Sequence, residues 1–436
     1  MNILHIFVKN SNTFENMKNV FNKIEKYNFW NAQKPDLGYE RKIYIDKISK
    51  YIDNRLIKVL VGQRRTGKSY ILRQIIFHLI NNKNINPANI FYVNKEYLGF
   101  DEIRNAQDLE KLFLYYKEKL QVNGKIYIFL DEVQNIENWQ SFVNSYSQDY
   151  TNKHELFITG SNSKLLSGEL ATLLSGRYVK FEILPFGFFE YADYKKLPAD
   201  KQSFIKYLQN GGLPEMFHFS DDEIKRHYIQ SLKDTIILRD IVQRYRIKDI
   251  VLLDDLFKYL ATNIGNLTSL NNIVKYFKNL QKKTNYETLS AYVDYLKDTF
   301  IIHEVERYDL RGKKILGGVK KYYLNDLAFK NYLYGILPAD IGYNLENFVY
   351  LQLLRMGYKV NTGKKDNTEI DFIAEKNHTK IYVQVSYLLE NKKTIQREFG
   401  NLETIKDHYE KIVISMDDIK LTNYKGIKHL RPWELK

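Results

Sequence analysis

The stretch LIKVLVGQRRTGKSY, residues 56–70, decides the fold. Its apolar run Leu56–Val61 predicts a buried strand, and the following Gly62–Ser69 has the spacing G-x-x-x-x-G-K-S. Beyond the motif, apolar residues recur at the spacing of one helix face, at Ile71, Leu72, Ile75, Ile76, Leu79 and Ile80. A strand, a glycine-containing loop and a helix in this order form the context in which the motif binds phosphate. The stretch therefore predicts a phosphate-binding loop in an α/β fold.

The residue types of this loop suit a nucleoside triphosphate. Glycines let the backbone close around phosphate oxygens, and the N–H groups and positive end of the following helix face the anion. We expect Lys68 to neutralise charge between the β- and γ-phosphates of ATP and Ser69 to bind Mg²⁺. Arg64 and Arg65 contact either the nucleotide or a neighbouring carboxylate. The candidate nucleotide-binding residues are Gly62, Gln63, Arg64, Arg65, Thr66, Gly67, Lys68, Ser69 and Tyr70.

Around this loop, short apolar runs alternate with amphipathic helices, a pattern that predicts a parallel sheet. The expected strands are residues 56–61, 90–94, 126–130, 156–159 and 179–184. The third strand ends in Asp131 and Glu132, about 60 residues after the loop. We expect Asp131 to bind Mg²⁺, directly or through water, and Glu132 to orient and polarise the attacking water.

Two further segments provide candidate catalytic residues. The fourth expected strand ends in Gly160-Ser161-Asn162-Ser163, so that Ser161 or Asn162 would lie beside the γ-phosphate. The alternative is an ordinary N-cap for a helix over residues 163–174. Arg177 follows Gly176 and reaches the phosphate of its own chain, the phosphate of a neighbouring subunit, or a surface carboxylate.

Composition limits the class of protein. The chain has 436 residues, enough for roughly three domains. It has no cysteine, which excludes disulfide scaffolds, cysteine nucleophiles and cysteine-bound metals. Its net charge of +14 suits a polyanion partner, although a coding bias towards lysine explains the charge equally well. With no signal-peptide pattern and no long apolar run, we expect a cytoplasmic protein without a membrane span.

The expected strands stop after Pro185, and residues 188–250 have helical patterns. Residues 251–325 predict three helices and a hairpin whose tip holds Arg311, Lys313 and Lys314, with Lys320 and Lys321 beyond. This order fits a winged helix-turn-helix that contacts DNA mainly through phosphates. Against DNA, the third helix has three acidic residues, Glu287, Asp294 and Asp298, and winged helices also bind proteins.

At these motifs the chain resembles the prokaryotic AAA+ ATPases of the origin-recognition and archaeal P-loop ATPase lineage. It is more specifically similar to the family that joins such an ATPase to a C-terminal restriction-endonuclease-like domain. Besides residues 62–69, the matching segments are Leu130-Asp131-Glu132-Val133-Gln134 with Trp139, Ile158–Ser163, Gly176-Arg177, Leu184-Pro185-Phe186 with Glu190, Gly211–Glu215, Arg239–Val242 and Glu369-Ile370-Asp371-Phe372.

The resemblance implies an AAA+ parallel sheet, a helical lid, a winged helix-turn-helix and a PD-(D/E)XK-like α/β domain. The expected segments are an N-terminal extension (1–50), the P-loop ATPase core (51–187), the lid (188–250), the winged helix (251–328) and a degenerate nuclease-like domain (329–436).

A nuclease site of this type needs a helix acid, a strand Asp and an acid-x-Lys on the next strand. The first two positions are Glu346 and Asp371, but the third reads Gln384-Val385-Ser386. A neutral amide and a hydroxyl weaken metal binding and water activation. We therefore expect a weak or dead nuclease fold kept for binding DNA or protein, or carboxylates that are merely structural. Lys380 is the remaining candidate for the missing cation.

The sequence thus predicts a Mg²⁺-dependent ATPase that couples its nucleotide state to DNA binding. A homo-oligomer is compatible with this prediction. The alternatives are an ATP-gated regulatory or protein-binding module with little turnover, and an ATP-regulated nuclease.

Overall fold

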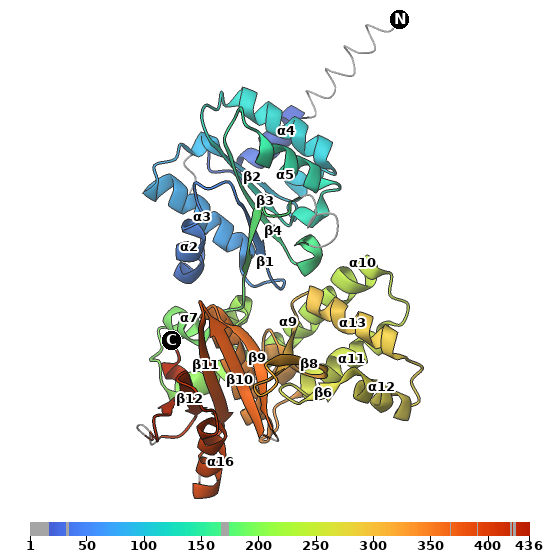
Figure 1. The fold of residues 1–436 in the computed structure, drawn as a ribbon. Coiled ribbons are helices and arrows are strands. Elements are labelled where there is room, and N and C mark those ends of the chain that lie inside the picture. Colours follow the sequence, from blue (N-terminus) through green and yellow to red (C-terminus); the bar gives the residue numbers. More distant parts are fainter. Residues whose placement is uncertain are drawn as a thin grey trace, which may run out of the picture. The chain divides into compact units, whose positions relative to one another are not determined.

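The computed structural model divides the chain into two compact units, residues 1–183 and residues 184–436. Figure 1 shows the course of the chain through both. The residues that the structure describes are 17–31, 35–166, 174–366, 368–389, 391–418, 421 and 424–436.

The first unit is built on a five-stranded sheet with the order β2-β3-β4-β1-β5. The strands are β1 (Ile57–Val61), β2 (Ile90–Asn94), β3 (Ile126–Asp131), β4 (His154–Gly160) and β5 (Tyr178–Glu182). All neighbouring strands pair in parallel, so the predicted α/β fold with a parallel sheet is confirmed. Because the strands are parallel, the segments that follow β1, β3 and β4 meet at one end of the sheet.

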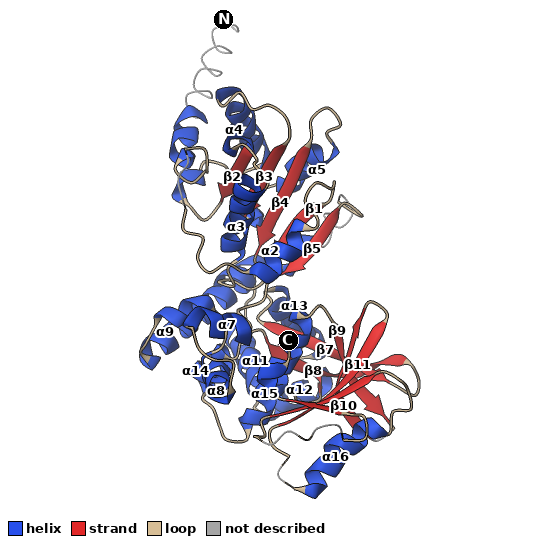
Figure 2. Cartoon of the chain, turned by 90° about the vertical axis from the view of Figure 1, so that its left-hand side faces the viewer, coloured by secondary structure: helices blue, strands red, loops and turns tan. Residues whose placement is uncertain are grey.

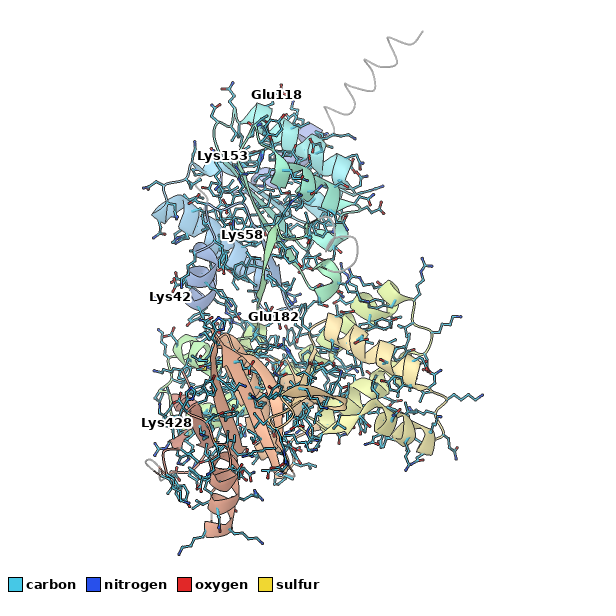
Figure 3. All side chains as sticks on the ribbon, viewed as in Figure 1. Lys42, Lys58, Glu118, Lys153, Glu182 and Lys428 are labelled. Atoms are coloured by element: carbon cyan, nitrogen blue, oxygen red, sulfur yellow. The ribbon has the colours of Figure 1, made fainter. Side chains whose placement is uncertain are left out.

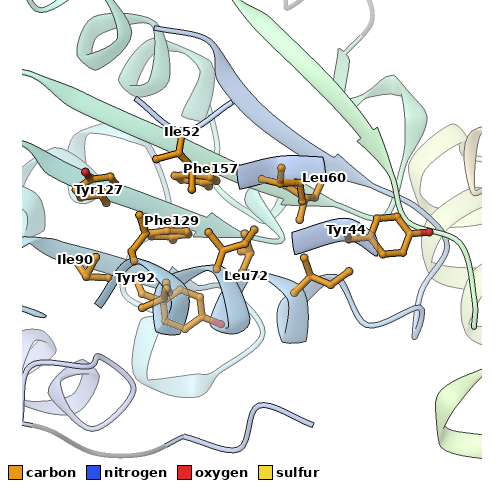
Figure 4. Packing of buried hydrophobic residues seen from close by; sticks show 14 of the residues in the cluster. Tyr44, Ile52, Leu60, Leu72, Ile90, Tyr92, Tyr127, Phe129 and Phe157 are labelled. Carbon is orange, nitrogen blue, oxygen red and sulfur yellow. The ribbon is translucent and has the colours of Figure 1, made fainter. Parts of the chain in front are cut away.

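Helices cover both faces of this sheet. They are α2 (Lys42–Ser49), α3 (Lys68–Asn82), α4 (Ala106–Lys119) and α5 (Trp139–Gln148), with the short turns η1 (Pro87–Asn89), η2 (Leu98–Phe100), η3 (Val133–Asn135) and η4 (Ser163–Leu166). On one face Leu60, Phe129 and Phe157 pack against Leu72 of α3, as Figure 4 shows. Since strand side chains alternate, Phe91 points to the other face, where its ring meets Phe113 of α4.

Residues 17–31 and 35–50, expected as an extension, are part of this first unit. The side-chain amide of Asn28 pairs with the backbone of Tyr92 in the outermost strand β2, donating to its oxygen at 3.0 Å and accepting from its N–H at 2.9 Å. The Trp30 indole donates to the Ile90 oxygen at 2.7 Å. These contacts satisfy backbone groups of an otherwise open strand. The segment therefore belongs to the sheet's structure rather than lying outside it.

The second unit begins with helices, as the sequence predicts for residues 188–250. They are α7 (Phe188–Lys195), α8 (Lys201–Asn210), η5 (Pro214–His218), α9 (Asp222–Thr235), the π-helical η6 (Ile236–Val242) and α10 (Gln243–Tyr245). The later helical elements are α11 (Ile250–Thr262), α12 (Leu270–Asn279), α13 (Tyr286–Asp298), α14 (Ala328–Tyr334), α15 (Asp340–Arg355), α16 (Lys392–Glu403) and η7 (Pro432–Glu434). None of the helices in the described ranges is long and apolar enough to cross a lipid bilayer.

One eight-stranded sheet runs through the second unit in the order β13-β12-β11-β10-β9-β7-β8-β6. Figure 2 labels its strands β7 to β11. The strands are β6 (Thr268–Ser269), β7 (Ile302–Asp309), β8 (Lys314–Leu324), β9 (Lys359–Lys365), β10 (Thr368–Lys376), β11 (Thr379–Ser386), β12 (Glu410–Ser415) and β13 (Lys428–Leu430). The hairpin β7–β8 joins the C-terminal strands because β7 pairs in parallel with β9. Segments 251–328 and 329–436, expected as separate domains, therefore share a single sheet.

Candidate nucleotide-binding site and a second polar cluster

The glycines of the loop occupy positions that other residues fit poorly. Gly62 has φ 153°, and a Cβ there would lie 2.3 Å from the Ile183 carbonyl oxygen beside β5. Gly67 has φ 93° and is the N-cap of α3. The backbone thus passes directly from β1 through the loop into the first turn of a 15-residue helix. This places the positive end of α3 at the loop, as an anion site requires.

The side chain of Lys68 folds back over the loop and is buried. Its Nζ donates to the Gly62 oxygen at 3.0 Å and to the Gln63 oxygen at 3.1 Å. It also lies 3.5 Å from Oε1 of Glu132. The structure therefore brings the predicted phosphate-binding lysine and the predicted water-orienting carboxylate together.

Asp131 lies at the end of β3 in a fully enclosed environment. Its Oδ1 accepts from the Thr159 hydroxyl at 2.5 Å, and its Oδ2 accepts from the Tyr92 hydroxyl at 3.0 Å and from the Asn94 amide at 2.9 Å. The Ser69 hydroxyl is near this carboxyl group and favours its ionised form. Burial, followed by the neighbouring charge of Glu132, raises the pKa of Asp131 to about 6. The two predicted metal ligands, Ser69 and Asp131, are thus direct neighbours.

Glu132 is held in a left-handed backbone conformation with φ 53°, and its N–H donates to the Thr159 hydroxyl at 2.9 Å. Its carboxylate accepts from the Gln134 amide. Burial favours the neutral carboxyl, but the Lys68 ammonium and the Gln134 hydrogen bond outweigh burial and lower the pKa of Glu132. Sequence reasoning assigned no role to Thr159 or Gln134. Their positions, at the end of β4 and two residues after Glu132, could have indicated that they contact the two carboxylates.

Asn162 follows β4 and is 1% exposed. Its Oδ1 accepts from the Lys164 N–H at 2.8 Å, so the N-cap alternative accounts for half of the side chain. Its Nδ2 is buried and has no hydrogen-bond partner among the residues that the structure describes. Ser161 is also buried, and its hydroxyl lies 3.4 Å from the Gln134 amide nitrogen. The helix expected over 163–174 is a 3₁₀ turn over Ser163–Leu166, and residues 167–173 lie outside the described residues.

The remaining loop residues divide into buried and exposed side chains. Gln63 and Thr66 are buried, and the Thr66 hydroxyl donates to the Gln63 oxygen at 3.0 Å. Arg64 lies 3.1 Å from Glu96, which fits the carboxylate alternative, while Arg65 is exposed with φ 66°.

Two groups contact the exposed Tyr70 side chain. Its hydroxyl donates to Asp36 at 3.2 Å, and the Arg73 guanidinium lies 4.1 Å from the ring centre. Tyr70 is therefore fixed against the segment before α2 and not against the phosphate loop.

Arg177 lies at the opposite end of the sheet from the loop. Its carbonyl oxygen accepts from the N–H of Ile57, the first residue of β1, and its guanidinium donates to Asn144 of α5 at 3.1 Å. The loop follows the last residue of β1, about 16 Å further along the strand. The expectation that Arg177 reaches the phosphates of its own chain is therefore not supported, because β5 runs parallel to β1. The neighbouring-subunit alternative stays a prediction.

These residues fit Mg²⁺ and ATP by their chemistry. A hydroxyl and a carboxylate, Ser69 and Asp131, are the hard oxygen ligands that Mg²⁺ prefers. The Lys68 ammonium and the helix end favour a polyphosphate. The buried Nδ2 of Asn162 is a donor that a phosphate oxygen or water would satisfy.

The second unit contains a separate polar cluster at the predicted nuclease-like site. Glu346 of α15 and Asp371 of β10 come together around the Nζ of Lys321 from β8, at 2.8 and 3.6 Å. Glu369 also lies 2.6 Å from this ammonium. Gln384 of β11 is adjacent, since its Oε1 accepts from the Asp371 N–H at 3.4 Å.

The cation in this cluster is therefore Lys321, which sequence reasoning placed in a basic hairpin. Lys380 lies instead 2.8 Å from Glu375. Burial and then the charge of Glu346 raise the pKa of Asp371 to about 8. Despite its burial, the surrounding carboxylates raise the pKa of Lys321. Across the described residues, no group of three or more acidic or histidine side chains is arranged to hold a metal ion.

The surface of the hairpin is less uniformly basic than its sequence suggests. Lys320 lies 2.8 Å from Glu304 and is used internally, as Lys321 is. At the tip, Lys313 and Lys314 are exposed. On α13 the acidic residues are partly compensated, because Asp294 lies 3.1 Å from Lys297. Of the four lysines of the hairpin named above, the exposed ones are thus Lys313 and Lys314 at its tip.

Comparison with known families identifies two segments. Residues 54–192 match the family described as AAA domain. Residues 201–340 match a family described only as a domain of unknown function, DUF8612.

Two relatives match over most of their length. An uncharacterised protein of Haemophilus influenzae is 36% identical over 393 residues, which cover 89% of this chain and 96% of that protein. An uncharacterised protein of Methanocaldococcus jannaschii is 32% identical over 388 residues, covering 85% and 82%.

Among solved structures, Orc1 of Aeropyrum pernix, in complex with DNA, has a TM-score of 0.30 at 14% identity, covering 69% of this chain and 93% of that chain. Cdc6p of Pyrobaculum aerophilum has a TM-score of 0.29 at 13% identity, covering 67% and 92%. TM-scores of this size are too low to establish a shared arrangement of the whole chain.

Proposed function

The chain belongs to the same family as the Haemophilus influenzae and Methanocaldococcus jannaschii proteins and carries an AAA domain, and on this premise we propose that it is a Mg²⁺-dependent ATPase that couples its nucleotide state to DNA binding. The observation that carries the proposal is the contact between two separate motifs. Lys68 of the phosphate loop lies 3.5 Å from Glu132 after β3, while the Ser69 hydroxyl is close enough to Asp131 to influence its pKa.

Each of these residues has a separate task in the proposed reaction. The loop N–H groups and Lys68 bind the phosphates, and Ser69 and Asp131 hold Mg²⁺. Mg²⁺, when bound, supplies positive charge that offsets the charge of the phosphate oxygens. Glu132 is kept ionised by Lys68 and oriented by Gln134, so it orients and polarises the attacking water. Asn162 donates its buried Nδ2 to the γ-phosphate or to that water.

The DNA-binding part of the proposal rests on the order of elements in residues 250–324. Three helices, α11, α12 and α13, are followed by the β7–β8 hairpin, and the short strand β6 between α11 and α12 pairs with β8. This order of elements supports the interpretation of these residues as a winged helix. The exposed Lys313 and Lys314 at the tip are placed to contact phosphates, which predicts salt-sensitive binding without strong sequence preference.

The cluster around Lys321 disfavours the nuclease alternative. The ammonium lies between Glu346, Glu369 and Asp371, where a nuclease would bind its metal ion. We therefore retain the interpretation of a catalytically weak or dead nuclease fold. The regulatory alternative, with ATP binding but little turnover, shares every residue of the nucleotide site.

The test is phosphate release from ATP with Mg²⁺, measured with and without duplex DNA at low and high salt. Wild type is expected to hydrolyse ATP, and the K68A variant is expected to lose nucleotide binding. Stimulation by DNA that fades at high salt supports the coupling. ATP binding without turnover favours the regulatory module, whereas equal phosphate release by wild type and K68A overturns the ATPase. Nicking of DNA in Mg²⁺ or Mn²⁺ would restore the nuclease alternative.

A further inference from the structure

The carbonyl group of Thr66 in the phosphate loop is held from outside by the segment that precedes α2. The Arg41 guanidinium donates from Nη1 to the Thr66 oxygen at 3.1 Å. Arg41 is 2% exposed, and its guanidinium lies 4.6 Å from the ring centre of Tyr44. The contact places a buried cation against a backbone oxygen of the phosphate loop.

The geometry of the peptide bond gives this contact a consequence for the loop. In a trans peptide the C=O of one residue and the N–H of the next point in opposite directions. Thr66 and Gly67 share such a unit, so fixing the Thr66 oxygen towards Arg41 aims the Gly67 N–H to the opposite side. Gly67 is the N-cap of α3, where free N–H groups bind anions.

Arg41 is in turn fixed to α3 through Gln74. The Gln74 side chain accepts from the Arg41 N–H at 3.2 Å and donates to the oxygens of Leu37 and Tyr39 at 2.6 and 2.7 Å. One buried amide on α3 therefore holds three backbone groups of the segment over residues 37–41. Arg41 is therefore held by Gln74 of α3, the helix that follows the phosphate loop, and its guanidinium reaches that loop.

The geometry points to Arg41 as a positioning residue for the phosphate loop, which sets the orientation of the Thr66–Gly67 peptide and thereby the affinity for polyphosphate. This inference deepens the proposed nucleotide site and rests on it. Arg41 contacts the loop backbone and not the reacting atoms, so its loss is expected to act on binding more than on the rate of the bound complex.

The test compares R41M and R41K with wild type in the full-length chain. Binding is measured by calorimetry with ATP and with tripolyphosphate, which has no base, and hydrolysis is measured as KM and kcat. R41M is expected to weaken both ligands roughly tenfold, with kcat changed less than about threefold. R41K retains one donor and is expected to recover part of the affinity. K42A is the control, because Lys42 is the next residue and its side chain is exposed (Figure 3).

The outcomes separate this inference from the function on which it rests. A wild-type chain that binds neither ligand overturns both. Wild-type binding with unchanged affinity in R41M overturns the role of Arg41 alone, as does a loss confined to ATP with normal tripolyphosphate binding. If R41M does not fold, Q74M tests the same support. Q74M with wild-type tripolyphosphate affinity then rejects the inference, and weakened affinity with a normal kcat supports it.

Discussion

The ammonium of Lys68 lies 3.5 Å from Oε1 of Glu132, and both side chains are buried. This contact joins the loop after β1 to the residue after β3. It explains why Glu132 stays ionised in a site that burial would otherwise make neutral, because the lysine charge lowers its pKa. A base that must accept or polarise a proton near neutral pH needs this ionised form.

Replacement of that carboxylate should separate binding from turnover. E132Q keeps the size of the side chain but removes its charge, so ATP is expected to bind while kcat falls by about 10²- to 10³-fold. Nucleotide affinity and steady-state phosphate release measure the two effects. The matched control is E137Q, whose side chain is exposed five residues later. A kcat in E132Q within a few-fold of wild type would remove Glu132 from the mechanism.

The burial of Asp131 predicts that the free energy of unfolding depends on pH. Its pKa is raised to about 6 in the folded chain. The protonated group therefore contributes to the free energy of unfolding at low pH, and this contribution is lost as the pH rises through about 6. Relative to wild type, D131N is therefore expected to gain about 1 to 2 kcal/mol in free energy of unfolding between pH 5 and pH 8. Urea unfolding without nucleotide at both pH values measures it. A pH-independent difference contradicts the prediction.

Lys321 should be important for the stability of the second unit. K321M leaves Glu346, Glu369 and Asp371 without their cation, and we expect a loss of about 3 kcal/mol in unfolding free energy. The loss should grow with pH, because protonation of the carboxylates relieves it. In the control K320M, Glu304 keeps Lys297 as a partner, and a loss below about 1 kcal/mol is expected. Equal losses in both variants would argue against the buried cluster.

The hairpin tip should account for part of any DNA affinity. K313A/K314A is expected to weaken duplex binding and to make the slope of log affinity against log salt shallower by about 2, one unit for each lost phosphate contact. Fluorescence anisotropy across a salt series measures this slope. K196A/K206A removes the same charge from exposed positions of the helical segment and is the control. If both variants change the slope equally, net charge rather than the hairpin determines binding.

Local sequence order was sufficient to predict the parallel sheet and the positions of Lys68, Asp131 and Glu132. A strand, its loop and the next helix are adjacent in sequence, and parallel strands bring their ends together. Arg177 could have been placed as well, because a residue before a parallel strand must lie at the far end of the sheet from the loop.

The roles of Arg41 and Lys321 could not be predicted in this way. Arg41 lies in a stretch without clear periodicity, and its partner Thr66 is 25 residues away. Lys321 lies in a hairpin sequence that contains several other basic residues, so a solvent-exposed basic wing was the simpler interpretation. Both depend on how distant elements pack, which no local pattern records.

The pairing of β7 with β9 has a consequence for attempts to divide the protein. A cut near residue 328 would turn the interior strand β7 into an open edge with unsatisfied backbone groups. It would also separate Lys321 from its carboxylates. Fragments made at that point should self-associate or remain insoluble. We therefore expect the two parts to fold together, and studies of either are best done by point substitution in the intact polypeptide.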